Sequence, residues 1–136
     1  MRLAFFATVV LLVCMGYFML GSLPLLILKH DTPMDARFIR GLFNLYYMAV
    51  ILMATVGAVG YALAQRPLFV VLMAGIAVLA VATRRVIVLG MDRLRSTMTG
   101  ADAPVIARFR KLHVTGMVLN VVQLAVIAAA MTQIRI

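Results

Sequence analysis

The chain has 136 residues and is 65% hydrophobic and only 12% charged, with a mean hydropathy of +1.12. Soluble globular domains have an apolar share nearer half, so this composition excludes a soluble domain and indicates an integral membrane protein. We interpret the net charge of +9 as a marker of membrane orientation that also attracts anionic lipid headgroups, rather than as a sign of nucleic-acid binding.

Four spanning helices, at about 20 apolar residues each, would use nearly the whole chain. We expect the first helix over residues 3–28, retained in the protein because it lacks a small-x-small cleavage site and exceeds the length of a signal-peptide core. In the segment Thr32-Pro33-Met34-Asp35, Thr32 is typical of a helix N-cap and Pro33 of the first helical position. The segment therefore predicts a second helix over residues 33–64.

The third and fourth helices also have recognisable starts. Gln65-Arg66 predicts a tight turn before Pro67 opens a helix over residues 67–98. Asp102-Ala103-Pro104 is typical of a cap and first turn, and predicts the last helix over residues 103–133.

So short a turn near residue 65 makes the second and third helices antiparallel neighbours. Both contain small residues, which allow helix backbones to approach closely in membranes. We expect the following small residues to face one another across that pair: Ala54, Gly57 and Gly60 with Ala74, Gly75 and Ala77.

Lysine and arginine are distributed unevenly along the chain. Three of the 13 lie near the two termini and the turn between the second and third helices, namely Arg2, Arg66 and Arg135, and the other ten lie in or beside the two longer connections. The positive-inside rule then predicts that both termini are outside and that the second to fourth helices extend into the cytoplasm. We therefore expect an all-α, integral membrane four-helix bundle, with residues 1–136 as a single transmembrane domain of a bacterial inner membrane and both termini periplasmic.

Polar side chains gather toward the predicted cytoplasmic end. His113, Asn120 and Gln123 share one face of the fourth helix. A similar stripe runs along the second helix, and at about 1.5 Å per residue the paired arginines of the third helix reach the same depth. The candidate ligand-binding residues are Arg37, Arg40, Asn44, Tyr47, Arg84, Arg85, His113, Asn120 and Gln123.

A purely structural interpretation of these residues stays open. Arginines near the end of a spanning helix commonly extend to the headgroups, and tyrosines commonly belong to the interfacial belt, which would account for Arg84, Arg85 and Tyr47. Asn120 and Gln123 would then only join the fourth helix to a neighbour.

The residue inventory argues against several kinds of chemistry. Cys14 is the single cysteine, which excludes membrane dithiol oxidoreductases. Glutamate is absent and the four aspartates lie outside the most apolar segments, which argues against a proton-coupled exporter. We predict no catalytic residue, no metal site and no cofactor. An alternative is a haem held by His30 and His113, the only two histidines.

Two segments resemble a known family. FIRGLFNLYY, residues 38–47, and FRKLHVTGMVLN, residues 109–120, are similar to the segments that open the second and last helices in a small bacterial four-helix membrane family related to eukaryotic transmembrane protein 205. The resemblance implies the four-helix architecture and no established activity.

A second resemblance is to the membrane-associated eicosanoid and glutathione metabolism family. Arg37, Arg40 and Asn44 match the spacing of its second-helix signature, and Arg84 with Gly90 falls at a spacing similar to its third-helix pattern. This resemblance implies trimers that bind glutathione at the cytoplasmic side. The family's glutamate is expected where this chain has Tyr47, which is a departure from the pattern.

Our leading expectation is a non-enzymatic membrane protein that binds a lipid or isoprenoid-like ligand, or that acts as an accessory subunit of a larger membrane complex. The polar layer is rich in donors and poor in acids, which suits anionic or carbonyl groups. The alternative is a glutathione-dependent or oxygenase-type enzyme with a cytoplasm-facing site. Expected partners are membrane lipids and either a larger complex or further copies of the chain, without nucleic acid.

Overall fold

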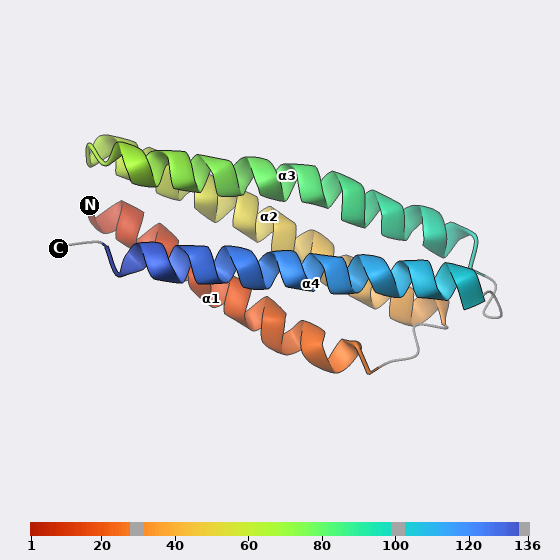
Figure 1. Ribbon diagram of the computed structural model, residues 1–136. Coiled ribbons are helices and arrows are strands. Elements are labelled where there is room, and N and C mark those ends of the chain that lie inside the picture. Colours follow the sequence, from red (N-terminus) through yellow and green to blue (C-terminus); the bar gives the residue numbers. More distant parts are fainter. Residues whose placement is uncertain (28–31, 99–102, 134–136) are drawn as a thin grey trace.

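The computed structural model describes residues 1–27, 32–98 and 103–133, and within them it contains four long helices and no strand. The four helices are α1 (Arg2–Leu25), α2 (Pro33–Leu63), α3 (Pro67–Ser96) and α4 (Ala103–Met131). Consecutive helices run in opposite directions, and both chain ends lie at the same end of the bundle (Figure 1). The predicted all-α, four-helix architecture is confirmed.

The local signals at the ends of α2 act as the sequence suggests. The Thr32 hydroxyl accepts a hydrogen bond from the Asp35 backbone N–H at 3.1 Å, and Pro33 is the first helical residue. At the other end Gln65 adopts a left-handed backbone with φ of 54°, and Arg66 N–H donates to the Tyr61 carbonyl at 3.0 Å. This closing pattern reverses the chain in very few residues. Asp102, the expected opening residue of α4, lies outside the described residues.

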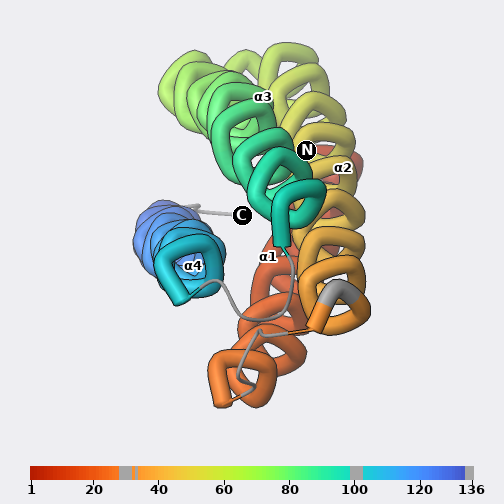
Figure 2. Tube along the Cα trace, turned by 90° about the vertical axis from the view of Figure 1, so that its right-hand side faces the viewer, coloured from red at the N-terminus to blue at the C-terminus, as the bar shows by residue number. Residues whose placement is uncertain are grey.

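Each helix packs against the next one in the chain, and α4 returns to pack against α1. The helices therefore form a ring in which α4 is diagonal to α2. In the view along the helices, α4 stands on the side of the bundle away from α2 (Figure 2). Aromatic side chains fill the centre: Phe18 stacks on Tyr46 with 4.0 Å between ring centroids and meets Phe43 edge-on at 4.9 Å. Such ring pairs add to the stabilisation from burial alone.

Among the small residues of α2, Gly60 faces α1, which corrects our expectation for that residue. A Cβ added to Gly60 would lie 2.9 Å from the backbone N and Cα of Ala4, whereas one added to Gly57 would lie 3.5 Å from the Met73 side chain of α3 and 3.9 Å from Ala7 Cβ of α1. On α3, Ala74 and Gly75 are exposed, and a Cβ on Gly75 would meet nothing within 4 Å. The expectation that Gly60 faces α3 and that Ala74 and Gly75 face α2 was therefore wrong, because α1 crosses α2 at Gly60 and the two small residues of α3 point outward.

All four helices are long and apolar enough to cross a membrane. Large apolar side chains point outward along much of their length, among them Leu20, Leu68 and Val78. A helix satisfies its own backbone hydrogen bonds, which is the condition for lying in hydrocarbon. The outer surface and the backbone therefore both suit a lipid environment.

Two matched glycine substitutions test the α1–α2 crossing. We expect Gly60→Ala to destabilise the protein by about 1–3 kcal/mol because the new methyl group meets the backbone of Ala4. Gly75→Ala should be neutral or stabilising by up to about 1 kcal/mol, because its methyl group enters open space in a helix. Thermal unfolding in a mild detergent measures both. Equal effects of the two substitutions would contradict the crossing.

Candidate functional site

The three polar side chains predicted to share a face of α4 are all buried in the bundle. His113, Asn120 and Gln123 are among the buried residues of α4, together with Gly116 and Ile127. An α-helix places residues three and four apart on one side, and this side faces the helices opposite. The shared inward face is therefore confirmed.

His113 makes a short polar contact between α4 and α1. Its Nε2 lies 2.8 Å from the Ser22 hydroxyl of α1, and both side chains are fully buried. The Phe43 ring meets the imidazole edge-on at 5.4 Å. Phe43 also fills the space beside Gly116, where an added Cβ would overlap its ring. A buried hydroxyl needs a hydrogen-bond partner, so the Ser22–His113 bond joins α1 to α4.

Farther along α4, toward its C-terminal end, the two amide side chains contact different helices. Asn120 Nδ2 donates to the Met15 carbonyl of α1 at 3.3 Å, and Gln123 Oε1 accepts from the Tyr46 hydroxyl of α2 at a long 3.5 Å. Asn120 Oδ1 is buried and has no hydrogen-bond partner within the described part of the chain. The contacts join α4 to both neighbouring and diagonal helices.

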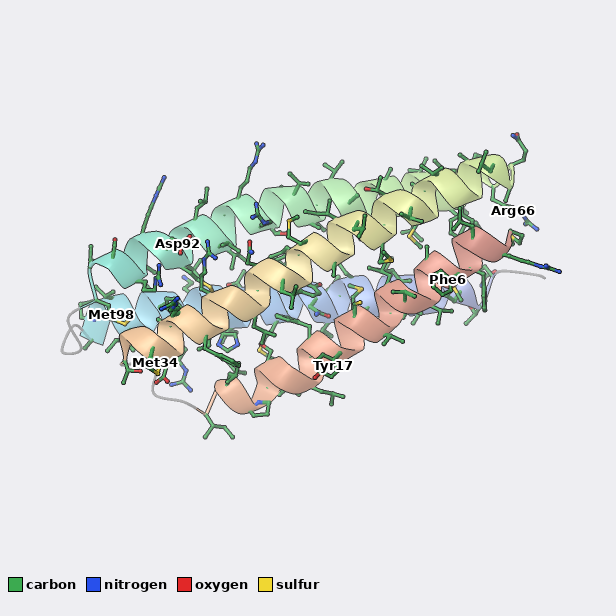
Figure 3. The ribbon with its side chains drawn as sticks, turned by 180° about the vertical axis from the view of Figure 1, so that it is seen from behind. Phe6, Tyr17, Met34, Arg66, Asp92 and Met98 are labelled. Carbon is green, nitrogen blue, oxygen red and sulfur yellow. The ribbon has the colours of Figure 1, made fainter. Side chains whose placement is uncertain are left out.

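A second polar group joins α2 to α3 near the end opposite the chain termini. Arg40 donates from Nε and Nη2 to the two carboxylate oxygens of Asp92, at 2.9 and 2.8 Å. Arg84 donates to Asn44 Oδ1 through Nε and Nη2, at 3.2 and 2.8 Å. In the side-chain view, Asp92 points from α3 toward nitrogen atoms of the facing helices (Figure 3). Two-pronged pairs of this kind are stronger and more directional than single contacts.

The structure therefore divides the nine candidate residues. Arg40, Asn44 and Arg84 lie together across α2 and α3, whereas His113, Asn120 and Gln123 line the inner face of α4. Tyr47 is buried against the rings of Phe43 and Tyr46, and its hydroxyl has no hydrogen-bond partner within the described residues.

The remaining two candidates, Arg37 and Arg85, are exposed. Asp92 was not among the candidates. The sequence did contain a signal for it: Asp92 is an acid at the same level along the helices as the basic residues, and an arginine there attracts a carboxylate.

A hollow runs along the outer surface of α2, and one part of it also borders α1. One part, of about 590 Å³, is lined by Met34, Arg37, Phe38, Gly41, Leu42 and Leu45. A second part, of about 220 Å³, is lined by Val13, Cys14, Tyr17, Phe18, Leu42, Leu45, Tyr46 and Ala49. Leu42 and Leu45 border both parts, so we treat them as one feature, the α1/α2 groove. Of the predicted candidates, only Arg37 borders it.

Sequence reasoning missed the apolar wall of the α1/α2 groove. Its residues look like ordinary lipid-facing positions, and Tyr17 is indeed 77% exposed. The one available signal was the placement of aromatic residues on the outer faces of both helices, at Tyr17 and Phe38. Which of these faces would form a groove depends on the angle between the helices.

Metal and haem binding can be examined only in part. Within residues 1–27, 32–98 and 103–133, no group of three histidine, cysteine or acidic side chains could hold a metal ion. The alternative of a haem between His30 and His113 involves His30, which lies outside the described residues.

The Ser22–His113 contact can be tested against a serine that makes only a local bond. We expect Ser22→Ala to lower stability by roughly 0.5–1.5 kcal/mol because a buried interhelical hydrogen bond is lost. Ser96→Ala is the control, since the Ser96 hydroxyl is exposed and donates to Arg93 in its own helix. Thermal unfolding in detergent measures the difference. Indistinguishable midpoints for the two variants would show that the contact contributes nothing.

The chain matches none of the protein-family models, curated proteins or solved structures with which it was compared.

Proposed function

We propose that this protein is a non-enzymatic integral membrane protein that binds a lipid-like ligand with a single isoprenoid-type chain. The observation that carries the proposal is the α1/α2 groove, whose wall is almost entirely apolar and whose one charged border residue among those that the structure describes is Arg37. Ligand sites are typically apolar hollows with a few polar groups that set orientation.

The arrangement of the groove matches an amphiphile with one polar end. The labelled residues Met34 and Tyr17 mark its two parts (Figure 3). From Met34 to Leu45 the helix rises roughly 16 Å, at about 1.5 Å per residue. A carbonyl or anionic group of the ligand would bond to the Arg37 guanidinium, and its chain would lie on Leu42, Leu45 and Phe18.

The enzyme alternative receives less support from the geometry. A glutathione-type site would use Arg40, Asn44 and His113 as donors to the substrate. Arg40 is instead paired with Asp92, Asn44 accepts from Arg84, and His113 is fully buried beside Ser22. The resemblance to the family related to transmembrane protein 205 agrees with a membrane protein without established catalysis.

Filling the groove should abolish ligand binding. A benzoquinone with a short isoprenoid chain, at about 100 times its Kd, should stabilise the protein by about 2–3 kcal/mol. We expect Ala49→Phe, which fills the narrower part of the groove, to remove this stabilisation, and Arg37→Gln to reduce it. Val78→Phe, on an exposed position of α3, is the control.

Thermal unfolding with and without the quinone gives the readout for all three variants. Retained stabilisation in Ala49→Phe would place the ligand elsewhere. Absence of stabilisation in the unsubstituted protein, by the quinone and by co-extracted membrane lipids alike, would remove the proposal.

We further propose that the chain lies in a bacterial inner membrane with both termini in the periplasm. The support is the excess of basic residues beside the two longer connections. Orientation can be tested with Cys14→Ser as a background, in which no other cysteine remains. Arg66→Cys should react with an impermeant maleimide in intact spheroplasts, and Thr97→Cys only after permeabilisation. The reverse pattern would invert the topology.

A further inference from the structure

A second groove, between α3 and α4, carries an unusual concentration of positive charge. It has a volume of about 400 Å³, and its charged lining residues are Arg93 of α3 with Arg108 and Lys111 of α4. Leu94, Leu112 and Gly90 form its apolar lining, and a Cβ on Gly90 would lie 2.9 Å from a terminal methyl group of Leu112. None of the described residues that line the groove is acidic.

These three positive charges are not compensated by the described part of the protein. The side chains of Arg93, Arg108 and Lys111 are exposed and make no hydrogen bond or ion pair to another described residue. The neighbouring Asp92 is bound by Arg40 at 2.8 Å and lies 3.8 Å from Arg95. Since opposite charges attract, an anion in this groove would be attracted by all three side chains.

Three other arginines of the same layer differ in this respect. Arg40 and Arg84 donate to Asp92 and Asn44, and Arg110 Nη2 donates to the Leu26 carbonyl at 3.1 Å. Their hydrogen-bonding groups are engaged in joining helices. The α3/α4 groove thus gathers three cations whose donors remain available.

The apolar part of the same seam continues toward the other end of the bundle. Beyond Thr115, which borders the basic groove, a further hollow of about 310 Å³ has one polar lining residue among those described, Gln123, and is otherwise lined by Val71, Leu72, Gly75, Ile76, Leu79, Val122 and Val126. From Thr115 to Val122 the helix rises roughly 10 Å. A charged head and an apolar chain could therefore lie in successive parts of one seam.

We propose that the α3/α4 seam is a binding site for an anionic glycerophospholipid, whose phosphate lies among Arg93, Arg108 and Lys111 and whose acyl chain follows α3 and α4 past Gly75. The combination of cations at one end and apolar walls at the other matches a phospholipid, whereas a soluble anion would use only the basic end. This site goes beyond the proposed function, because it lies on the opposite seam from the α1/α2 groove and takes a different ligand.

The test compares two variants with the same loss of charge. In the groove variant Arg93, Arg108 and Lys111 are replaced by Gln, and in the control variant Arg2, Arg66 and Arg85 are replaced by Gln. Native mass spectrometry counts phosphatidylglycerol and phosphatidylcholine retained by each protein from an equimolar mixture. Each basic residue near an anionic surface changes affinity by about fivefold, so the groove variant should lose its preference for phosphatidylglycerol by tenfold to a hundredfold, while the control keeps it.

A second pair of measurements examines the acyl chain and the headgroup separately. We expect Gly75→Phe, which fills the open apolar part, to weaken retention of long-chain phosphatidylglycerol more than that of a short-chain form. Glycerol phosphate alone should not raise the unfolding temperature at millimolar concentration. Stabilisation by glycerol phosphate equal to that by the lipid would overturn the acyl-chain part of the proposal.

The remaining outcomes decide the proposal as a whole. An unchanged lipid preference in the groove variant, or an equal loss in the control variant, would show that retention reflects diffuse charge and would overturn the site. Neither result depends on Arg37 or Ala49. The proposal for the α1/α2 groove and the proposal for the α3/α4 seam can therefore be refuted independently.

Discussion

A polar side chain inside hydrocarbon is costly unless another group of the protein satisfies it, and α4 carries three such side chains on one face. This face determines how α4 joins the bundle. Ser22 and Met15 of α1 meet His113 and Asn120, and Tyr46 of α2 reaches Gln123 from the diagonal position. Phe43 then fills the space that Gly116 leaves open. The centre of the bundle is consequently built around the inner face of α4.

The helices pack tightly at some places and leave grooves at others, and side-chain size decides which. Gly60 brings the backbone of α2 against Ala4 where the two chain segments cross. Toward the other end of α1, Phe18 and Tyr46 stack between the helices, and the two ribbons diverge (Figure 1). The α1/α2 groove is a result of this difference, because small residues at one end and rings at the other make the helices cross at an angle.

The charged residues toward the end of the bundle opposite the chain termini fall into two groups with different roles. Arg40 and Arg84 are held by Asp92 and Asn44 and stabilise the α2–α3 pair. Arg93, Arg108 and Lys111 line a groove to which the described residues contribute no acid. Both groups look alike in a count of basic residues. Among the described residues, however, only the arginines of the first group form hydrogen bonds or ion pairs with other side chains of the protein. The second is therefore the more informative about what surrounds the bundle.

The sequence by itself determined the four helices, the Thr32 cap, the short turn at Gln65 and the inward face of α4. These features depend on local periodicity and on residues close in the chain. Only the tertiary structure decided that Ser22 meets His113, that Asp92 binds Arg40, and that Gly60 faces Ala4 of α1. Partners and grooves depend on the rotation and crossing angles of whole helices, which arise from the packing of all four together and leave no trace in the spacing of any one of them.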